Sequence, residues 1–357
     1  MISIVLTNRN RDLKIVKNCL DSLGQQSNNH FELFFVDYGS NDEYLSELEK
    51  VIAKYQKINF INCPVSGQLW NKCRAINIVL QKCNTPYFFV GDMDMIFHPD
   101  FVKKLYELKS ENKVIYFKVG FLSKNETLFL KEFHNAEVDF VSQKEVTGMT
   151  LCPTKLLKEI NGYNEFYHGW GAEDTDVHVR LQNLGIDVEF YNKEILLKHQ
   201  WHPKKYRSTL SKDPYHFNLE RINHSYVQIA QMSRQTKANI STPWGILPDF
   251  NEYERLANKP DFEIFTEPDI LKVNAILAQF NNLEDKVVSI TIKDTLFRNK
   301  TKQFIKRILH KKYKTYLSLK NVNDLILQEI AIHYRNLPYR YSFDQKQNVI
   351  QLKIYFQ

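Results

Sequence analysis

The chain has 357 residues, of which 43% are hydrophobic and 25% are charged, and this composition excludes wholesale disorder. Its length predicts one large domain with an appendage, or two domains. The net charge of +7 is concentrated in residues 293–320, which contain ten Lys or Arg residues and one acid, Asp294. That segment carries +9, so the rest of the chain carries −2 and is not basic.

The five cysteines form no Cys-x-x-Cys pair, and their odd number and spacings fit neither a zinc ribbon nor a secreted disulfide framework. We therefore expect reduced thiols in a cytoplasmic protein. The apolar run at residues 2–6 is too short for a signal peptide, and Arg9 and Arg11 follow it. No window of about 18 uninterrupted apolar residues occurs, which predicts no membrane-spanning helix.

Short apolar runs alternate with amphipathic stretches along the first half of the chain. The apolar runs predict strands at residues 2–6, 31–36, 58–61 and 87–90. Between them, apolar residues spaced three or four apart predict helices at residues 13–23, 45–52 and 74–80. Strands that alternate with helices predict an α/β fold with a mostly parallel central sheet, in which ligands bind beyond the carboxyl ends of the strands.

The second half of the chain has a different character. Ten of the eleven glycines lie at or before Gly185, which places the tight turns of a binding site in the first half. Beyond about residue 215, helix-like stretches occur at 226–232 and 264–280, and strands are predicted at 287–292 and 349–356. We expect a catalytic domain over residues 1–212 and a mainly helical extension over residues 213–357.

The first candidate site follows the predicted strand at residues 31–36. Asp37 ends this strand, and a Gly39-Ser40 turn and Asp42 come next. An acid at the carboxyl end of a strand can accept hydrogen bonds from a base N–H or a ribose hydroxyl. The alternative is a simple strand-to-helix turn in which Asp42 caps the next helix.

The second candidate site follows the predicted strand at residues 87–90. Asp92 and Asp94 form an Asp-x-Asp triplet directly after it, and paired carboxylates repel each other unless a cation lies beside them. Mg²⁺ and Mn²⁺ prefer oxygen ligands and also bind nucleotide phosphates. The pattern therefore indicates a divalent cation site, and the alternative is a solvated turn.

The third candidate site lies at residues 169–176, where two glycines flank Trp170 and acids follow. The acids begin an amphipathic stretch that Gly185 ends as an expected C′ residue. Acids in the first turn are also favoured by the helix dipole, which is the structural alternative. That alternative does not explain Trp170 between its two glycines, whereas an indole there could stack on a sugar ring. A carboxylate held there would be ready to take a proton from an acceptor hydroxyl.

Two histidines, His199 and His202, flank Trp201 after an apolar run. Neutral imidazole is a common ligand for transition metal ions, so this pair is a candidate metal site. A histidine pair in a loop is also often structural or solvated, and the local pattern leaves both interpretations open.

Six short motifs occur in an order that resembles inverting glycosyltransferases with the GT-A fold. They are Thr7-Asn8-Arg9, Asp37-Tyr-Gly-Ser, Asp92-Met-Asp94, Asn161-Gly-Tyr, Gly169-Trp-Gly-Ala-Glu-Asp174 and His199-Gln-Trp-His202. Among the broad family 2 relatives, the resemblance is closest to the β-1,4-galactosyltransferase and chondroitin-polymerase type, and it covers about residues 1–210. Two positions depart from the family pattern. Asp37 is a single acid instead of a pair, and Thr7 stands where many relatives have proline.

The resemblance implies a role for each motif. Asp37 would contact the uridine of a UDP-sugar, and Arg74 would lie near the nucleotide together with the motif Thr7-Asn8-Arg9. Asp94 would be the principal ligand of a Mn²⁺ or Mg²⁺ ion, with Asp92 nearer the ribose or the metal's waters. His202 and His199 would complete the metal shell.

The acceptor side is implied in the same way. Glu173 and Asp174 would bind the acceptor, with Asp174 as the base, and Trp170 would help to align the two sugars. The expected reaction is a single displacement with inversion, in which a hexose or N-acetylhexosamine passes from the UDP-sugar to a hydroxyl of a glycan or lipid-linked glycan. The resemblance points to surface polysaccharide or lipopolysaccharide synthesis.

Residues 297–314 alternate basic residues with apolar ones and predict a basic amphipathic helix. Such a helix suits an anionic membrane surface, which would give a peripheral location at the inner face of the cell membrane. The alternative is a solvated face packed on the protein. Nucleic acid is not an expected partner, since no recognition fold accompanies the charge.

Two other classes of protein remain as alternatives. One is a sugar-binding or scaffold protein that has the GT-A fold without catalysis, although the chain has every proposed metal and base residue. The other is a nucleotidyltransferase, which also places acids at strand ends. Nucleotidyltransferases normally begin with a glycine-rich basic loop, and residues 7–12 contain no glycine.

Overall fold

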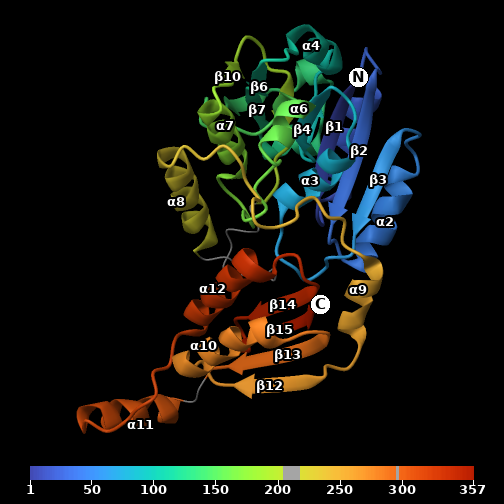
Figure 1. The fold of residues 1–357 in the computed structure, drawn as a ribbon. Helices are drawn as coiled ribbons and strands as arrows, with labels where there is room; N and C mark the ends of the chain where they lie inside the picture. Colours follow the sequence, from blue (N-terminus) through green and yellow to red (C-terminus); the bar gives the residue numbers. More distant parts are fainter. Residues whose placement is uncertain (204–217, 295–296) are drawn as a thin grey trace. The chain divides into compact units, whose positions relative to one another are not determined.

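The computed structural model describes residues 1–203, 218–294 and 297–357, which form two compact units (Figure 1). The first unit consists of Met1–Cys63, Trp70–Pro203 and Asn223–Leu247. The second unit consists of Pro64–Leu69, Pro248–Gln357 and the described residues 218–222. The predicted domain boundary between residues 212 and 213 lies outside the described residues.

A seven-stranded sheet forms the centre of the first unit, in the order β10-β6-β9-β4-β1-β2-β3. Its strands are β1 (Ile2–Asn8), β2 (Phe31–Tyr38), β3 (Ile58–Cys63), β4 (Tyr87–Asp92), β6 (Lys113–Phe117), β9 (Thr150–Pro153) and β10 (Asp187–Tyr191). β9 runs antiparallel to β4 and β6, and the remaining neighbours are parallel. The predicted α/β fold with a mostly parallel sheet is therefore confirmed.

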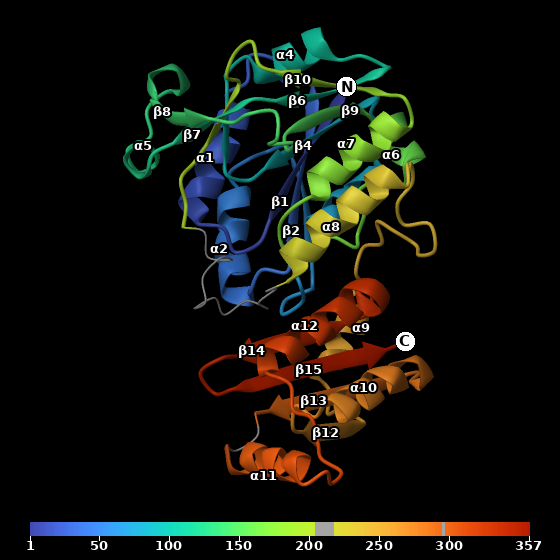
Figure 2. The same cartoon turned by 90° about the vertical axis from the view of Figure 1, so that its left-hand side faces the viewer.

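Helices cover both faces of this sheet. They are α1 (Leu13–Gly24), α2 (Asp42–Ile52), α3 (Lys72–Lys82), α4 (Phe101–Leu108), α6 (Thr154–Glu159), α7 (Glu173–Asn183) and α8 (Leu219–Met232). Figure 2 shows α1 and α2 on one side of the sheet and α6 and α7 on the other. α1 buries the predicted apolar stripe, including Val16, Leu20 and Leu23, because these positions recur on one helical face.

The ends of two helices test the sequence expectations closely. Asn41, and not Asp42, caps α2, because its side chain accepts a hydrogen bond from the Tyr44 N–H at 2.9 Å. Asp42 is the first helical residue, so the interpretation of Asp42 as a cap was wrong.

Gly185 follows α7 with φ of 85°, and the Ile186 N–H donates to the Leu181 carbonyl at 3.0 Å. The predicted helix end at Gly185 is confirmed as a Schellman motif.

A second sheet of four short strands lies beside the end of β4. Its order is β5-β11-β7-β8, with β5 (Met95–Phe97), β11 (Leu197–His199), β7 (Val119–Leu122) and β8 (Val138–Val141). The short helix α5 (Lys124–Leu128) connects the chain between β7 and β8. The sequence did not predict this sheet, because strands of three or four residues give too little alternation to be recognised.

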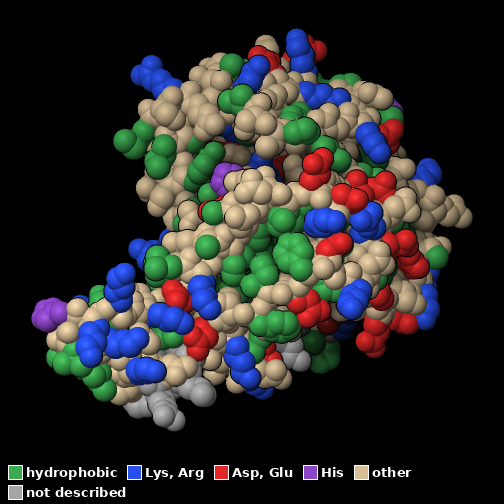
Figure 3. All heavy atoms as spheres, turned by 60° about the horizontal axis from the view of Figure 1, so that its bottom comes forward, with side chains coloured by type: hydrophobic (Ala, Val, Ile, Leu, Met, Phe, Trp, Pro, Cys, Tyr) green, Lys and Arg blue, Asp and Glu red, His purple; other side chains and the backbone are tan. Residues whose placement is uncertain are grey.

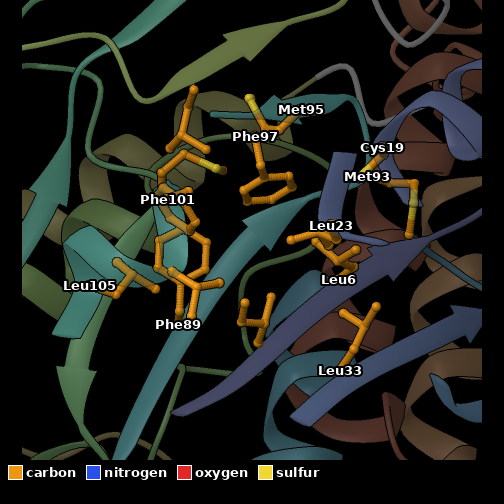
Figure 4. Close-up of a cluster of buried hydrophobic side chains, with 14 of the residues drawn as sticks. Leu6, Cys19, Leu23, Leu33, Phe89, Met93, Met95, Phe97, Phe101 and Leu105 are labelled. Carbon is orange, nitrogen blue, oxygen red and sulfur yellow. The ribbon is translucent and has the colours of Figure 1, made fainter. Parts of the chain in front are cut away.

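An aromatic cluster packs under the end of β4 (Figure 4). The rings of Phe89, Phe97 and Phe101 pack edge to face, with centroids 5.0 Å apart for Phe89 and Phe101 and 5.1 Å apart for Phe97 and Phe101. Each such pair contributes about 0.5–1.5 kcal/mol beyond the burial of its area. Since all three side chains are buried, they fix the strand and the turn that carry Asp92 and Asp94.

The second unit is built on a four-stranded sheet in the order β12-β13-β15-β14. Its strands are β12 (Phe262–Thr266), β13 (Lys286–Lys293), β14 (Tyr339–Asp344) and β15 (Val349–Phe356), and its helices are α9 (Phe250–Glu254), α10 (Ile270–Gln279), α11 (Phe297–Ile308) and α12 (Leu319–Glu329). The strands predicted at residues 287–292 and 349–356 are β13 and β15, whereas β12 and β14 were not predicted. The helix-like stretch 264–280 begins instead as strand β12, and Asp269 caps the helix that follows. No helix in residues 1–203, 218–294 and 297–357 is long and apolar enough to cross a membrane.

Candidate active site

The ends of three neighbouring strands bring predicted site residues to one edge of the central sheet. In the register of β1 with β2, Asn8 lies opposite Asp37, and in the register of β1 with β4, Thr7 lies opposite Asp92. Parallel strands end at the same edge, so residues separated by up to 85 positions in sequence become neighbours. This edge is the one at which ligands bind in open α/β sheets.

Asp37 is fully buried at this edge and holds the turn after β2. Its carboxylate accepts hydrogen bonds from Asn8 Nδ2 at 2.7 Å, from the Ser40 backbone N–H at 3.0 Å and from Ser40 Oγ at 2.7 Å. Burial raises the pKa of Asp37, although these hydrogen bonds oppose the shift. A carboxylate can accept about four hydrogen bonds, so Asp37 retains capacity for one more donor.

Two predicted nucleotide residues lie on the flanks of this edge. Arg9 follows directly after β1. Arg74 is buried in the first turn of α3, and its Nε donates to the Ile246 carbonyl at 3.2 Å. Arg74 therefore fixes residues from the end of the first unit against α3.

Asp94, His199 and His202 form the candidate cation site. His202 Nε2 lies 3.1 Å from Asp94 Oδ2, and His199 Nε2 lies 3.6 Å from Asp94 Oδ1. One ligand atom from each residue can be chosen so that all three atoms lie within 4.8 Å of one another. β11 creates this arrangement, because it pairs antiparallel with β5 and places His199 opposite Met95. The Gln200 N–H then donates to the Asp94 carbonyl at 2.8 Å.

The chemistry of these side chains fits a cation. His202 directs Nδ1 at the Pro203 carbonyl, 3.2 Å away, and Nε2 at Asp94 Oδ2, 3.1 Å away. A bound metal ion would take the place of the proton between Nε2 and the carboxylate. Asp94 Oδ1 is buried and accepts no hydrogen bond from the described part of the chain. Two imidazoles and a carboxylate are suitable ligands for Mn²⁺.

Arg11 also contacts this site, with its Nη2 atom 3.1 Å from Asp94 Oδ2. Burial raises the pKa of Asp94, but the charges of His199 and Arg11 and the hydrogen bond from His202 outweigh it and hold the pKa well below its usual range. Burial lowers the pKa of His199, and the Asp94 charge opposes this shift. Asp94 is therefore ionised, and a metal ion would bind the neutral form of His199.

Lys72 joins the acid triplet to the third candidate site. Its Nζ atom lies 3.0 Å from Asp92 Oδ1 and 3.0 Å from Asp174 Oδ2, and only 10% of its side chain is exposed. Burial would lower the pKa of Lys72, but the charges of Asp174 and Asp92 outweigh it and raise the pKa well above its usual value. Burial raises the pKa of Asp92 despite this contact. Lys72 is thus a buried ammonium shared by two carboxylates.

Sequence reasoning missed Lys72 and Arg11 as site residues. Charge balance was the available signal for Lys72, because the acids at 92, 173 and 174 need a cation when they meet. Lys72 also begins α3, the helix that leads into the strand carrying Asp92. Arg11 stood two residues after Arg9, and nothing local distinguished it from a solvated arginine.

A left-handed segment places the acids at the start of α7. Gly169, Gly171 and Ala172 have φ values of 72°, 105° and 69°, and Glu173 is the first residue of the helix. A left-handed conformation at alanine costs about 1–2 kcal/mol, so the surrounding structure imposes it. Trp170 projects from this segment with 44% of its surface exposed.

Glu173 has an unusual acidity in this position. Burial raises its pKa to about 7, and the neighbouring Asp174 charge adds to the effect. At neutral pH both the protonated and the ionised forms of Glu173 are therefore populated, whereas most surface glutamates are fully ionised.

The Asn161-Gly-Tyr163 motif has a structural role. Gly162 adopts φ of 66°, and a Cβ atom there would lie 2.4 Å from Asn77 Oδ1. Arg180 donates to the Gly162 carbonyl at 2.8 Å and pairs with Asp176 at 2.7 Å, and both side chains are fully buried. The motif thus fixes the position of α7 and of the acids at its start.

Within the described residues, the predicted catalytic and metal residues form two sets of contacts that adjoin at the Asp92–Asp94 triplet. Asp94 contacts His199 and His202, and Asp92 is connected to Asp174 through Lys72. Thr7, Asn8 and Asp37 lie at the adjacent strand ends.

Comparison with known proteins gives two family matches. Residues 3–163 match the model for glycosyl transferase family 2, and residues 128–203 match the model described as the N-terminal domain of galactosyltransferase. Chondroitin sulfate synthase 3 of Mus musculus is 22% identical over 179 residues, which are 48% of this chain and 20% of that protein. The teichoic acid poly(glycerol phosphate) polymerase of Staphylococcus epidermidis is 32% identical over 94 residues, which are 26% of this chain and 12% of that protein.

The chain therefore spans a fifth or less of the length of these two curated relatives. Among solved structures, TarS 1–349 of S. aureus in complex with UDP-GlcNAc is similar, with a TM-score of 0.47 and 15% identity. That similarity covers 65% of this chain and 69% of the TarS chain.

Proposed function

We propose that this chain, whose residues 3–163 match the model for glycosyl transferase family 2, transfers a sugar from a UDP-sugar to a glycan hydroxyl. The sugar is a hexose or an N-acetylhexosamine, and the reaction inverts its anomeric carbon. The observation that carries this proposal is the network in which Lys72 connects the candidate base Asp174 to the acid triplet of the candidate cation site. A base and a leaving-group site must be neighbours for a single displacement.

Asp94, His199 and His202 would hold a Mn²⁺ or Mg²⁺ ion, and the two imidazoles favour Mn²⁺. When bound, such an ion neutralises charge on a leaving diphosphate. Asp37, with Thr7, Asn8, Arg9 and Arg74 near it, would hold the nucleotide. Asp92 would lie toward the ribose or the waters of the ion. These assignments rest on the strand-end positions and on the motif order.

Asp174 would accept the proton of the acceptor hydroxyl, and Glu173 beside it would bind the acceptor. The acceptor oxygen forms a bond to the anomeric carbon, and the bond from that carbon to the diphosphate breaks with both electrons leaving on UDP. Lys72 pairs with Oδ2 of Asp174, and Oδ1 would take the acceptor proton. The exposed indole of Trp170 would stack on a sugar and align it with Asp174.

The second unit would bring the acceptor to the enzyme. In and after α11, Phe304 is 62% exposed and Ile308 is 60% exposed, next to Lys306, Arg307 and Lys311. The segment appears at the left of Figure 3, where apolar and basic side chains lie together. We propose that it binds an anionic membrane surface that carries a lipid-linked glycan, with the protein peripheral at the inner face. The side chains of residues 297, 298 and 300 lie outside the described set.

UDP release from a panel of donors tests the proposal directly. The panel is UDP-galactose, UDP-N-acetylgalactosamine, UDP-glucose and UDP-N-acetylglucosamine, each with and without Mn²⁺. We expect release from at least one donor only when Mn²⁺ is present. Donor binding without release or transfer would favour a sugar-binding scaffold instead, and pyrophosphate release from a nucleoside triphosphate would favour a nucleotidyltransferase.

A further inference from the structure

Two phenylalanine rings stack on the sheet that carries the candidate metal ligands. Phe121 of β7 and Phe140 of β8 have ring centroids 4.4 Å apart, and their planes differ by only 6°. Phe121 is partly buried, whereas 57% of Phe140 is exposed. Single exposed apolar side chains are ordinary on protein surfaces, but a stacked pair with an open outer ring is a preformed aromatic surface.

This stacked pair connects directly to the candidate cation site. Phe121 lies opposite His199 in the register of β7 with β11, and the two ring centroids are 4.9 Å apart. The His199 and His202 ring centroids are 5.2 Å apart. A continuous row of rings therefore runs from the exposed Phe140 to the ligand atoms beside Asp94.

The backbone around the pair is built to hold it in place. A Cβ atom on Gly120 would lie 2.8 Å from Val138 Cγ2, so glycine is what allows β8 to approach β7 closely. The Ser142 N–H donates to the Val119 carbonyl at 2.8 Å, and the Val119 N–H donates to Ser142 Oγ at 2.9 Å. Phe140 is consequently presented by a fixed strand pair, and little conformational entropy is lost when a ligand stacks on it.

The position of Phe140 distinguishes it from the residues that would hold the donor or the reacting sugar. Asp174 is reached from Asp92 through Lys72, whereas Phe140 is reached from Asp94 through His199 and Phe121. The candidate base and the exposed ring thus connect to the Asp92–Asp94 triplet through different side chains. The candidate nucleotide residues Thr7, Asn8 and Asp37 belong to the other sheet, toward the ends of β1 and β2.

We propose that the Phe140 ring, supported by Phe121, is a stacking subsite for a saccharide unit of the acceptor glycan beyond the unit that reacts. This inference rests on the proposed function. A pyranose ring has a flat apolar face of C–H groups that suits an aromatic ring, and its hydroxyls remain in water at the rim. The subsite makes the enzyme prefer an oligosaccharide acceptor to a monosaccharide.

The test compares three variants with the wild type. Phe140→Ala removes the ring, and Phe140→Tyr keeps it. Phe129→Ala is the matched control, because Phe129 is 75% exposed and no described ring contact involves it. Each protein, with Mn²⁺ and UDP, is applied to an array of mono- and oligosaccharides. KM values for donor and acceptor are then measured with the best-retained oligosaccharide and with its terminal monosaccharide, together with UDP release without acceptor.

For Phe140→Ala we expect a loss of array signal and a rise of about tenfold in the oligosaccharide KM. The donor KM, the monosaccharide KM and acceptor-free UDP release should remain within about twofold of wild type. Phe140→Tyr and Phe129→Ala should both behave as wild type. A raised donor KM, an unchanged oligosaccharide KM, or a wild type that retains no glycan on the array overturns the subsite. The proposed function fails separately, when the wild type releases UDP from no donor.

Discussion

The Nζ atom of Lys72 and the carboxylate of Asp174 form a part-buried ion pair at 3.0 Å between residues 102 positions apart. The same ammonium also pairs with Asp92 at 3.0 Å. Three acids, at 92, 173 and 174, interact with this single lysine. At this cluster, one buried ammonium group therefore faces three carboxyl groups.

Loss of the Lys72 charge should destabilise the first unit. Lys72→Met leaves Asp174 and Asp92 without their cation, and breaking a buried pair on one side costs about 3 kcal/mol. The cost should be lower in the double variant Lys72→Met with Asp174→Asn, because the orphaned charge is then removed as well. Urea unfolding of the four proteins of this cycle measures the coupling. If the decreases in the free energy of unfolding of the two single variants add up to that of the double variant, the ion pair does not stabilise the fold.

Asp174→Asn should reduce sugar transfer by about 10² to 10⁴ fold, because the amide cannot take the acceptor proton. Binding of UDP-sugar with Mn²⁺ should persist. Initial rates and calorimetric titration measure the two quantities. Asp187→Asn, at an exposed position of β10, is the control and should keep wild-type turnover. An Asp174→Asn enzyme with normal turnover would rule out the assignment of the base.

Mn²⁺ should bind the first unit through Asp94 and the two histidines. Adding Mn²⁺ at 100 times its Kd should stabilise the wild type by about 2.7 kcal/mol, since the folded state alone has the site. Asp94→Asn and His202→Ala should lose most of this stabilisation, whereas His224→Ala on α8 should keep it. Thermal unfolding with and without EDTA and Mn²⁺ tests this without any assay of activity. An equal response in all four proteins would place the ion elsewhere.

Glu173 should make the stability depend on pH in a particular direction. Its pKa is about 7 in the folded state against a usual value of 4.5, so the folded state holds this proton more tightly. The raised pKa therefore adds to the free energy of unfolding below pH 4.5, and this stabilisation is lost as the pH rises to about 7. Glu173→Gln has no carboxyl group to ionise and does not lose this stability. The free energy of unfolding of the variant relative to wild type should therefore be roughly 1–3 kcal/mol higher at pH 8 than at pH 4. Equal effects of the substitution at both pH values would contradict the raised pKa.

The basic amphipathic segment should bind anionic vesicles. Replacing Lys302, Lys306 and Arg307 by Gln should weaken binding to phosphatidylserine vesicles about 100-fold, at about 1 kcal/mol for each charge near the surface. The control replaces three exposed lysines of the first unit, Lys50, Lys54 and Lys57. Vesicle sedimentation at two salt concentrations measures both. A wild type that ignores vesicles, or binds neutral and anionic vesicles equally, would contradict the electrostatic contact.

Periodicity located four of the seven strands of the central sheet, because each of these four contains an apolar run followed by a turn. They are β1, β2, β3 and β4, and the runs at residues 287–292 and 349–356 also located β13 and β15. β6, β9 and β10 were not predicted. β12 was also missed, although Pro268 and Asp269 separate residues 262–266 from the helix that follows. Tertiary pairing with β13 decides its conformation, and a local pattern does not contain that information.

Some residues of the candidate site could be predicted from local sequence, and others could not. Asp37, Asp92 and Asp174 could be found because each lies where an apolar strand or helix meets a turn. The contact between Asp94 and His202 depends instead on the pairing of β5 with β11, two strands of three residues each. No short-range signal encodes that pairing. Lys72 was missed for a related reason, because its role appears only when two distant acids converge on it.

The shortness of β11 has a consequence for the chain beyond it. Three residues of strand are a weak tether, and the last of them, His199, is also a candidate metal ligand. An ion bound by Asp94, His199 and His202 would hold the backbone of residues 199–203 against β5. Resistance of this stretch to proteolytic cleavage would then rise with manganese concentration, so that cation supply would set the lifetime of the enzyme as well as its turnover.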